Sequence, residues 1–123
     1  MEFYFWSILI VMGVSYLAGL FAKCDKDYDN SAPRLYLSHL TGKRKRAYWA
    51  HQNGIEIFPV YVAAIFLAHL QSVDPAIINN VAIYFIISRV LYTGAYICDK
   101  PTMRSIFWGI GLAFIIGLFV LSA

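Results

Sequence analysis

The chain has 123 residues, of which 60% are hydrophobic and 17% aromatic, while only 14% are charged. This balance excludes an ordinary soluble globular domain, in which about a quarter of the residues carry a charge. The formal net charge of +3 comes from cations that flank hydrophobic segments, which favours anionic lipid headgroups over nucleic acid as their partners.

Four hydrophobic runs dominate the sequence. A helix needs about 20 apolar residues to cross a hydrocarbon core about 30 Å thick, and runs of this kind occupy residues 3–22, 47–70, 76–98 and 105–121. The first run follows Glu2 rather than a cation, so we interpret it as a retained span and not as a signal peptide. The sequence predicts an all-α integral membrane protein, with residues 1–123 forming one four-helix transmembrane bundle.

The distribution of basic residues predicts the orientation of this bundle. Hairpin connections place residues 23–46 and 99–104 on one side of the membrane, and the termini with the turn at 71–75 on the other. Nine of the ten Lys and Arg residues lie on the first side, and the tenth, Arg89, lies within a span. By the positive-inside rule we expect both termini to be periplasmic or luminal. We expect the block Lys43–Arg46 as a whole mainly to anchor the second span in the lipid headgroups. Arg46, the residue nearest the span, is the exception.

The first loop and the cysteines carry less information. Turn-forming residues mixed with leucines predict a turn and a short interfacial helix in this loop. Cys24 and Cys98 lie at span ends on the predicted cytoplasmic side, where thiols stay reduced, so we expect no disulfide. We expect no metal site either, because the three histidines lack ligand spacing: His39, His51 and His69.

Polar residues form a stripe along the second span. Glu56 lies about nine residues inside this apolar segment, where a carboxylate is costly and marks a candidate functional site. On a helix that turns about 100° per residue, four residues share a sector about 80° wide, while His51 points elsewhere. These four are Arg46, Trp49, Asn53 and Glu56.

The third span carries a matching stripe, Arg89, Tyr92 and Tyr96, at spacings i, i+3 and i+7. An antiparallel hairpin could bring Arg89 to the level of Glu56. One interpretation is structural, an ion pair between these two residues that locks the bundle. The other is a site for a polar, charged ligand, because the surrounding polar groups exceed what one ion pair needs.

Several motifs resemble the MAPEG family, the membrane-associated proteins in eicosanoid and glutathione metabolism. They are N-x-x-E-x-x-P from Asn53 to Pro59 after R-A at Arg46, then R-x-x-Y-x-x-x-Y from Arg89 to Tyr96, and R-S at Arg104. D-N-x-x-P-R from Asp29 to Arg34 is similar to bacterial members. The resemblance implies a homotrimer in a bacterial inner membrane, with glutathione bound between subunits and a lipophilic electrophile that arrives from the bilayer.

The resemblance also implies roles for individual residues. Asn53 and Glu56 would hold the amine of the glutamyl end of glutathione. Arg46 and Arg89 would bind the carboxylates of the tripeptide. Tyr92 and Tyr96 would line the site along the tripeptide. Arg104 would face the thiol, with Ser105 beside it, and together they would be the catalytic residues.

The residue types suit this chemistry, and one residue departs from the family pattern. A thiol with a pKa near 8.5 reacts as its thiolate, and a guanidinium can stabilise that anion. Trp49 stands four residues before Asn53, where many characterised members carry an arginine that binds glutathione. Arg44 and Arg46 are the candidates to replace that arginine.

Three functions are compatible with these observations. The first is a membrane-bound glutathione transferase or peroxidase acting on lipophilic electrophiles. The second is a structural or regulatory membrane protein on the same scaffold without catalysis. The third is a small proton-coupled multidrug exporter, which also has four spans, although such exporters carry their carboxylate in the first span.

Overall fold

The structure, a computed structural model, describes all 123 residues, and it contains helices and no strands. Its helices are α1 (Phe3–Ala22), α2 (Pro33–Ser38), α3 (Gly42–Leu70), α4 (Pro75–Ile97) and α5 (Pro101–Ser122). All except the short α2 are long and apolar enough to cross a membrane. The prediction of an all-α, four-helix membrane protein is confirmed.

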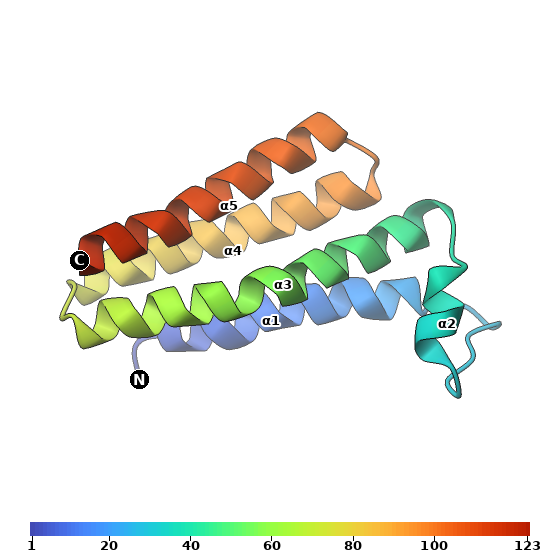
Figure 1. The fold of residues 1–123 in the computed structure, drawn as a ribbon, viewed down its shortest axis with the longest axis horizontal. Helices are drawn as coiled ribbons and strands as arrows, with labels where there is room; N and C mark the ends of the chain where they lie inside the picture. Colours follow the sequence, from blue (N-terminus) through green and yellow to red (C-terminus); the bar gives the residue numbers. More distant parts are fainter.

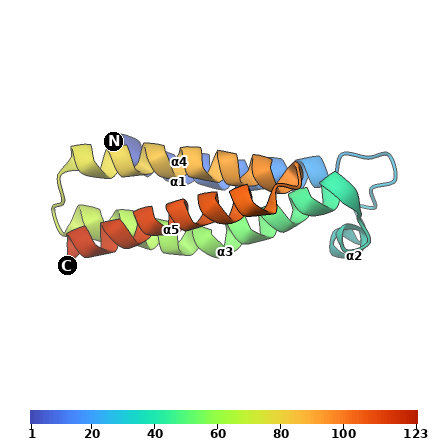
Figure 2. The ribbon, with the colours of Figure 1, turned by 90° about the horizontal axis from the view of Figure 1, so that it is seen from above.

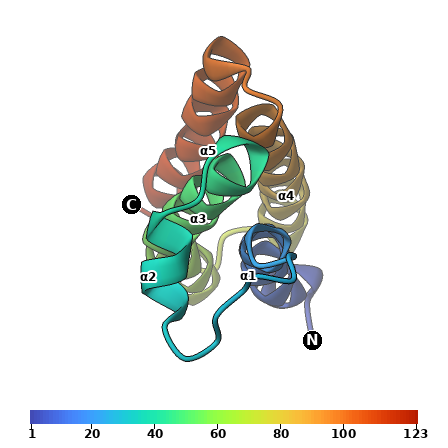
Figure 3. The same cartoon turned by 90° about the vertical axis from the view of Figure 1, so that its right-hand side faces the viewer.

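The four long helices form two antiparallel hairpins, α1 with α3 and α4 with α5. Both chain termini lie at one end of the bundle, and α2 lies at the other (Figure 1). The second view shows α1 beside α4 and α3 beside α5 (Figure 2). We call the end that carries residues 23–46 and 98–104 the basic end. The two hairpins diverge toward this end, where the start of α5 lies far from α2 (Figures 1 and 3).

Apolar packing explains why the hairpins meet at the other end. The largest cluster of buried hydrophobic residues includes Tyr4, Tyr61, Phe85 and Leu118, and the rings of Tyr61 and Phe85 stack at 4.2 Å. A separate and smaller buried cluster at the basic end consists of Ala22, Leu37 and Ala47. Because few large apolar side chains fill the space between the hairpins there, polar groups and cavities occupy it.

Small residues bring α1 and α3 into close contact. A Cβ atom at Gly54 would overlap the Ser15 hydroxyl, and one at Gly19 would lie 3.0 Å from His51 Nδ1. His51 Nδ1 in turn lies 2.8 Å from the Ser15 carbonyl oxygen. Close backbone approach through small residues is the usual way in which membrane helices associate. His51 therefore faces α1, away from the polar stripe of α3, as the helical spacing predicts.

The basic block belongs to α3 itself, which begins at Gly42 rather than at the predicted residue 47. Cations at a helix N-terminus oppose the helix dipole, yet three of them donate to carbonyls at the ends of other helices. Arg44 Nη2 donates to Ala22 O at 2.8 Å, Lys45 Nζ to Ser38 O at 2.8 Å, and Arg46 Nε to Ile97 O at 3.0 Å. These carbonyls lack helical partners. Arg44, Lys45 and Arg46 therefore cap α1, α2 and α4, a role that was not predicted from the sequence. The anchoring of Lys43–Arg46 in headgroups stays a prediction.

The first loop is ordered by side-chain contacts. The Asp29 carboxylate accepts hydrogen bonds from the Ser31 hydroxyl at 2.6 Å and the Ser31 backbone N–H at 2.9 Å, which lower the pKa of Asp29. Arg44 Nη1 forms an ion pair with Asp25 at 2.8 Å, and its Nη2 donates to the Tyr36 hydroxyl at 2.6 Å. The predicted short helix in this loop is present as α2.

Candidate functional site

A polar groove lies at the basic end between α3, α4 and α5. It consists of three cavities of about 400, 190 and 160 Å³, and Arg104 lines all of them. Seven of the eight predicted site residues line this groove: Arg46, Asn53, Glu56, Tyr92, Tyr96, Arg104 and Ser105. The eighth, Arg89, is buried behind it. The structure thus brings together residues that lie up to about 60 positions apart in the sequence, as expected when helical hairpins align two stripes.

The α3 side of the groove presents Arg46, Trp49, Asn53 and Glu56. Arg46 uses Nε to cap α4, and its side chain also lines the groove. Glu56 is exposed and has no hydrogen bond or ion pair within the chain. A free carboxylate at the surface of an apolar helix is costly in lipid, so this surface is suited to a cationic ligand group or to a neighbouring subunit.

Arg89 binds Asn53 and not Glu56. Its side chain is 3% exposed, and Nη2 donates to Asn53 Oδ1 at 2.9 Å, while Nη1 is buried without a partner. The guanidinium carbon lies 4.2 Å from the centroid of the Tyr92 ring. The ion-pair lock between Glu56 and Arg89 is therefore not formed, because the amide of Asn53 lies one helical turn nearer the basic end and takes the hydrogen bond.

Aromatic rings along the groove contact one another and are flanked by cations. Arg104 lies 4.6 Å from the centroid of the Tyr96 ring, and the Tyr96 ring meets Tyr92 edge to face at 5.7 Å. On the other side, Tyr96 lies 6.3 Å from Trp49, which has Lys45 Nζ 5.6 Å from its ring. Cation–π contacts hold these side chains in place without using the N–H donors of the cations. The Arg104 side chain also lies beside the Tyr92 hydroxyl, and its remaining N–H donors are free to bind an anion.

The first turn of α5 positions the proposed catalytic pair. The helix begins at Pro101, four residues before the predicted span, so Arg104 and Ser105 are helical residues. Ser105 is exposed and lines the smallest cavity with Trp108. Trp108 was not predicted from the sequence, although its i+4 spacing from Arg104 places both residues on one helical face. Gln52, Asp99 and Lys100 also line the groove.

The structure distinguishes the two candidates that could replace the family's arginine at Trp49. Arg44 uses both terminal nitrogens on Asp25, Ala22 and Tyr36 and does not line the groove. Arg46 does line it, beside Trp49 and Lys100. Among these two arginines, Arg46 alone is placed to meet a ligand in the groove.

The chemistry that the groove allows follows from its charges. Three cations, Arg46, Lys100 and Arg104, face one carboxylate, Asp99, in the cavity nearest the basic end. Deeper in the groove, Glu56 is the free carboxylate, and Asn53 and Gln52 supply amides. An elongated ligand with a cationic group at one end and anionic groups at the other matches this order of charges. No group of three or more His, Cys, Asp or Glu residues is arranged to hold a metal ion.

Comparisons with known proteins complete this description. No curated protein and no solved structure matches the chain significantly. The family model of the MAPEG family matches residues 3–123, which is nearly the whole chain and includes every residue of the groove. This four-helix integral membrane protein belongs to the MAPEG family.

Proposed function

We propose that the protein is a membrane-bound glutathione transferase or peroxidase, in which a glutathione thiolate attacks lipophilic electrophiles. The observation that carries this proposal is the convergence of seven motif residues on one groove around Arg104. Membership of the MAPEG family supports it. The family match also favours a transferase over the exporter that the four spans alone allow.

Glutathione binding follows from the order of charges in the groove. The ammonium of its glutamyl end would bind the free Glu56 carboxylate with help from Asn53. Its carboxylates would bind Arg46 and Lys100. Arg89 takes a positioning role in this proposal, because it is buried and its hydrogen bond fixes the amide of Asn53.

Arg104 is the residue best placed to activate the thiol. Lowering a thiol pKa by about two units requires about 2.7 kcal/mol of preferential stabilisation of the anion. A guanidinium supported on the face of Tyr96, with free donors, can supply a stabilisation of that size in a partly dry site. Ser105, one residue further along α5, lies beside the attacked atom or leaving group.

The electrophile would enter from the lipid side. Trp108 lines the groove and is 42% exposed. Its apolar ring joins the groove to the outer surface of α5. A lipophilic molecule could therefore reach the thiol without passing through water.

The decisive experiment measures the ultraviolet absorbance of the glutathione thiolate on purified protein in detergent. We expect the band to appear with glutathione and to be absent with S-methylglutathione, which cannot ionise. Binding of glutathione without the band would support a structural or regulatory protein on the same scaffold. Absence of any binding would overturn the proposal.

A further inference from the structure

Three residues form a waist between the two larger cavities of the groove. The outer cavity of about 190 Å³, nearest the basic end, and the inner cavity of about 400 Å³ share Trp49, Tyr96 and Arg104 and no other lining residue. Trp49 belongs to α3, Tyr96 to α4 and Arg104 to α5. A ligand that occupies both cavities must therefore pass between the rings of Trp49 and Tyr96.

The two rings of the waist differ in how firmly they are held. Tyr96 has the Arg104 guanidinium 4.6 Å from its ring centroid and meets Tyr92 edge to face at 5.7 Å. Trp49 lies 6.3 Å from Tyr96 with its ring tilted by 43°, and 43% of its surface is exposed. Trp49 is therefore the ring that can turn to admit a ligand and then cover it.

The waist favours an uncharged part of the ligand. A charged group placed between two aromatic rings loses water without gaining a partner of equal strength. Charged groups find such partners on either side of the waist, at Arg46 and Lys100 in the outer cavity and at Glu56 in the inner one. A planar amide loses least between the rings, because an aromatic face accepts its N–H. The waist therefore suits the peptide bonds of a ligand.

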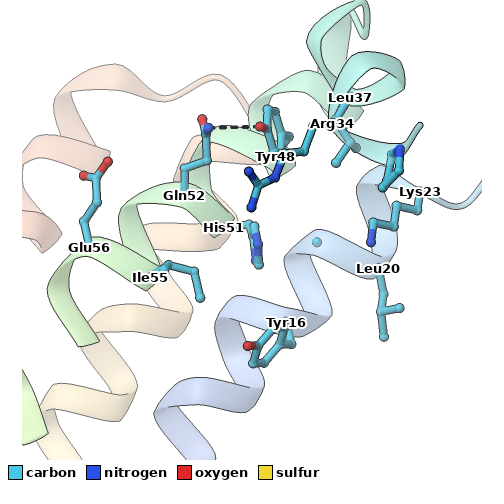
Figure 4. Close-up of a pocket in the computed structure, with 12 residues that line it drawn as sticks. Tyr16, Leu20, Lys23, Arg34, Leu37, Tyr48, His51, Gln52, Ile55 and Glu56 are labelled. Carbon is cyan, nitrogen blue, oxygen red and sulfur yellow. Dashed lines mark hydrogen bonds between the residues drawn. The ribbon is translucent and has the colours of Figure 1, made fainter. Parts of the chain in front are cut away.

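The distance between the charged groups sets the length of the ligand. Arg46 and Glu56 are ten positions apart on α3, or about 15 Å along the helix. Figure 4 shows Glu56 standing apart from Gln52, whose amide nitrogen donates to the Tyr48 hydroxyl at 3.0 Å. Three extended residues span about 10 Å, and the long side chains of Arg46 and Glu56 close the rest of the gap. A single amino acid is too short to reach both.

We propose that Trp49 is the residue that determines which thiol binds, and that it selects a peptide. The inference rests on the proposed function. The peptide bonds of the thiol substrate lie between Trp49 and Tyr96, with its carboxylates in the outer cavity and its ammonium group in the inner one. A thiol carried by the middle residue then faces Arg104. Single amino acids are excluded by their length, and thiols built on a sugar ring are excluded by their shape.

The test measures the binding of S-methylated ligands in detergent by isothermal titration calorimetry, because such ligands report recognition without ionisation of a thiol. The parent protein should bind S-methylglutathione at least about tenfold more tightly than S-methylcysteine or methyl thioglucoside. Trp49→Ala should weaken the binding of S-methylglutathione by about tenfold, the loss expected for an aromatic contact. Trp49→Phe should bind it within about threefold of the parent.

Two further variants serve as controls. Trp6→Ala removes the same side chain from α1, where Trp6 is exposed and lines no part of the groove, so it should bind S-methylglutathione as the parent does. Trp49→Arg supplies the charge that is usual in the family at this position. It should not recover the affinity lost in Trp49→Ala, because Arg46 and Lys100 already hold the carboxylates.

Several outcomes would overturn the inference. Equal affinity of Trp49→Ala and the parent would remove the role of the ring, and full recovery in Trp49→Arg would mean that charge is recognised instead. Equal affinity of the parent for S-methylcysteine would mean that the site does not select for length. Absence of S-methylglutathione binding by the parent would overturn the proposed function as well. Binding that depends on Trp49 in a protein without the thiolate band would support this inference and refute only catalysis.

Discussion

Arg104 is the single residue on which the proposed chemistry depends most. Its guanidinium is supported by Tyr96 and has free donors, and a planar fork holds a sulfur anion together with a second group. Lysine offers a compact, strongly hydrated charge instead. We expect Arg104→Lys to lower turnover with glutathione by at least about tenfold, or about 1.4 kcal/mol, without loss of thermal stability. Turnover equal to that of the parent would make Arg104 an anchor and leave Ser105 or Tyr96 to activate the thiol.

Glu56 and Arg89 should act independently of each other. Glu56→Gln should weaken glutathione binding by about tenfold and leave thermal stability nearly unchanged, because Glu56 has no partner within the subunit. In a double-mutant cycle, Glu56→Gln with Arg89→Gln should show coupling below about 0.5 kcal/mol, whereas Asn53→Ala with Arg89→Gln should show more than that. Strong coupling between positions 56 and 89 would restore the ion-pair interpretation.

The ends of α1, α2 and α4 depend on cations at the start of α3. Arg44 joins the end of α1, the first loop and α2 through Ala22, Asp25 and Tyr36. We expect Arg44→Ala to lower the stability of the protein in detergent by about 1–3 kcal/mol, because it leaves these acceptors unpaired. Lys43→Ala is the matched control, since Lys43 is exposed. Thermal denaturation of both variants measures the difference, and equal melting temperatures would contradict the capping role.

The contact of α1 with α3 depends on one glycine. A methyl group at Gly54 would overlap Ser15, whereas one at Gly13 would meet nothing within 4 Å. Gly54→Ala should therefore destabilise the bundle by about 1–3 kcal/mol, and Gly13→Ala should not. The double variant Gly54→Ala with Ser15→Gly should recover much of the loss. If Gly54→Ala melts at the parent temperature, α1 and α3 do not pack as closely as described.

The fold and part of the site could be predicted from the sequence for physical reasons. Span length and composition determine the four helices, and helical spacing places Asn53 and Glu56 on one face. The partner of Arg89 could not be predicted, because the shift of one helix along another decides whether residue 53 or residue 56 lies opposite. The caps formed by Arg44, Lys45 and Arg46 were also missed, since they depend on carbonyls that only the folded bundle brings near.

At the scale of the whole molecule, the exposed Glu56 favours assembly. A carboxylate at the lipid-facing surface is costly, and a neighbouring subunit would remove that cost by covering it. We expect native mass spectrometry in mild detergent to show a trimer, with three times the 14.0 kDa mass of the chain. A stable dimer would instead favour an arrangement typical of small exporters.

Orientation is the second prediction at this scale. The cations gather at the basic end, and none lies in the turn 71–74 or beside the termini. A reporter fused after Ala123 should therefore be periplasmic or luminal, and one inserted near Asp27 cytoplasmic. A cytoplasmic reporter at Ala123 would place the groove on the opposite side of the membrane.

The divergence of the two hairpins has a consequence for the size of ligand that the groove accepts. Between the basic end and the apolar core, only two hydrogen bonds connect the hairpins. Arg46 binds the Ile97 carbonyl at the basic end, and Arg89 binds Asn53 deeper in the bundle. A bulky molecule that pushes α4 and α5 away from α3 must stretch both bonds, while the stacked core at the far end stays closed and serves as the pivot. A wider molecule therefore binds at a higher cost in free energy, because it weakens the hydrogen bonds of Arg46 and Arg89. Replacing either arginine by a residue with a shorter side chain should broaden the range of electrophiles and favour larger ones.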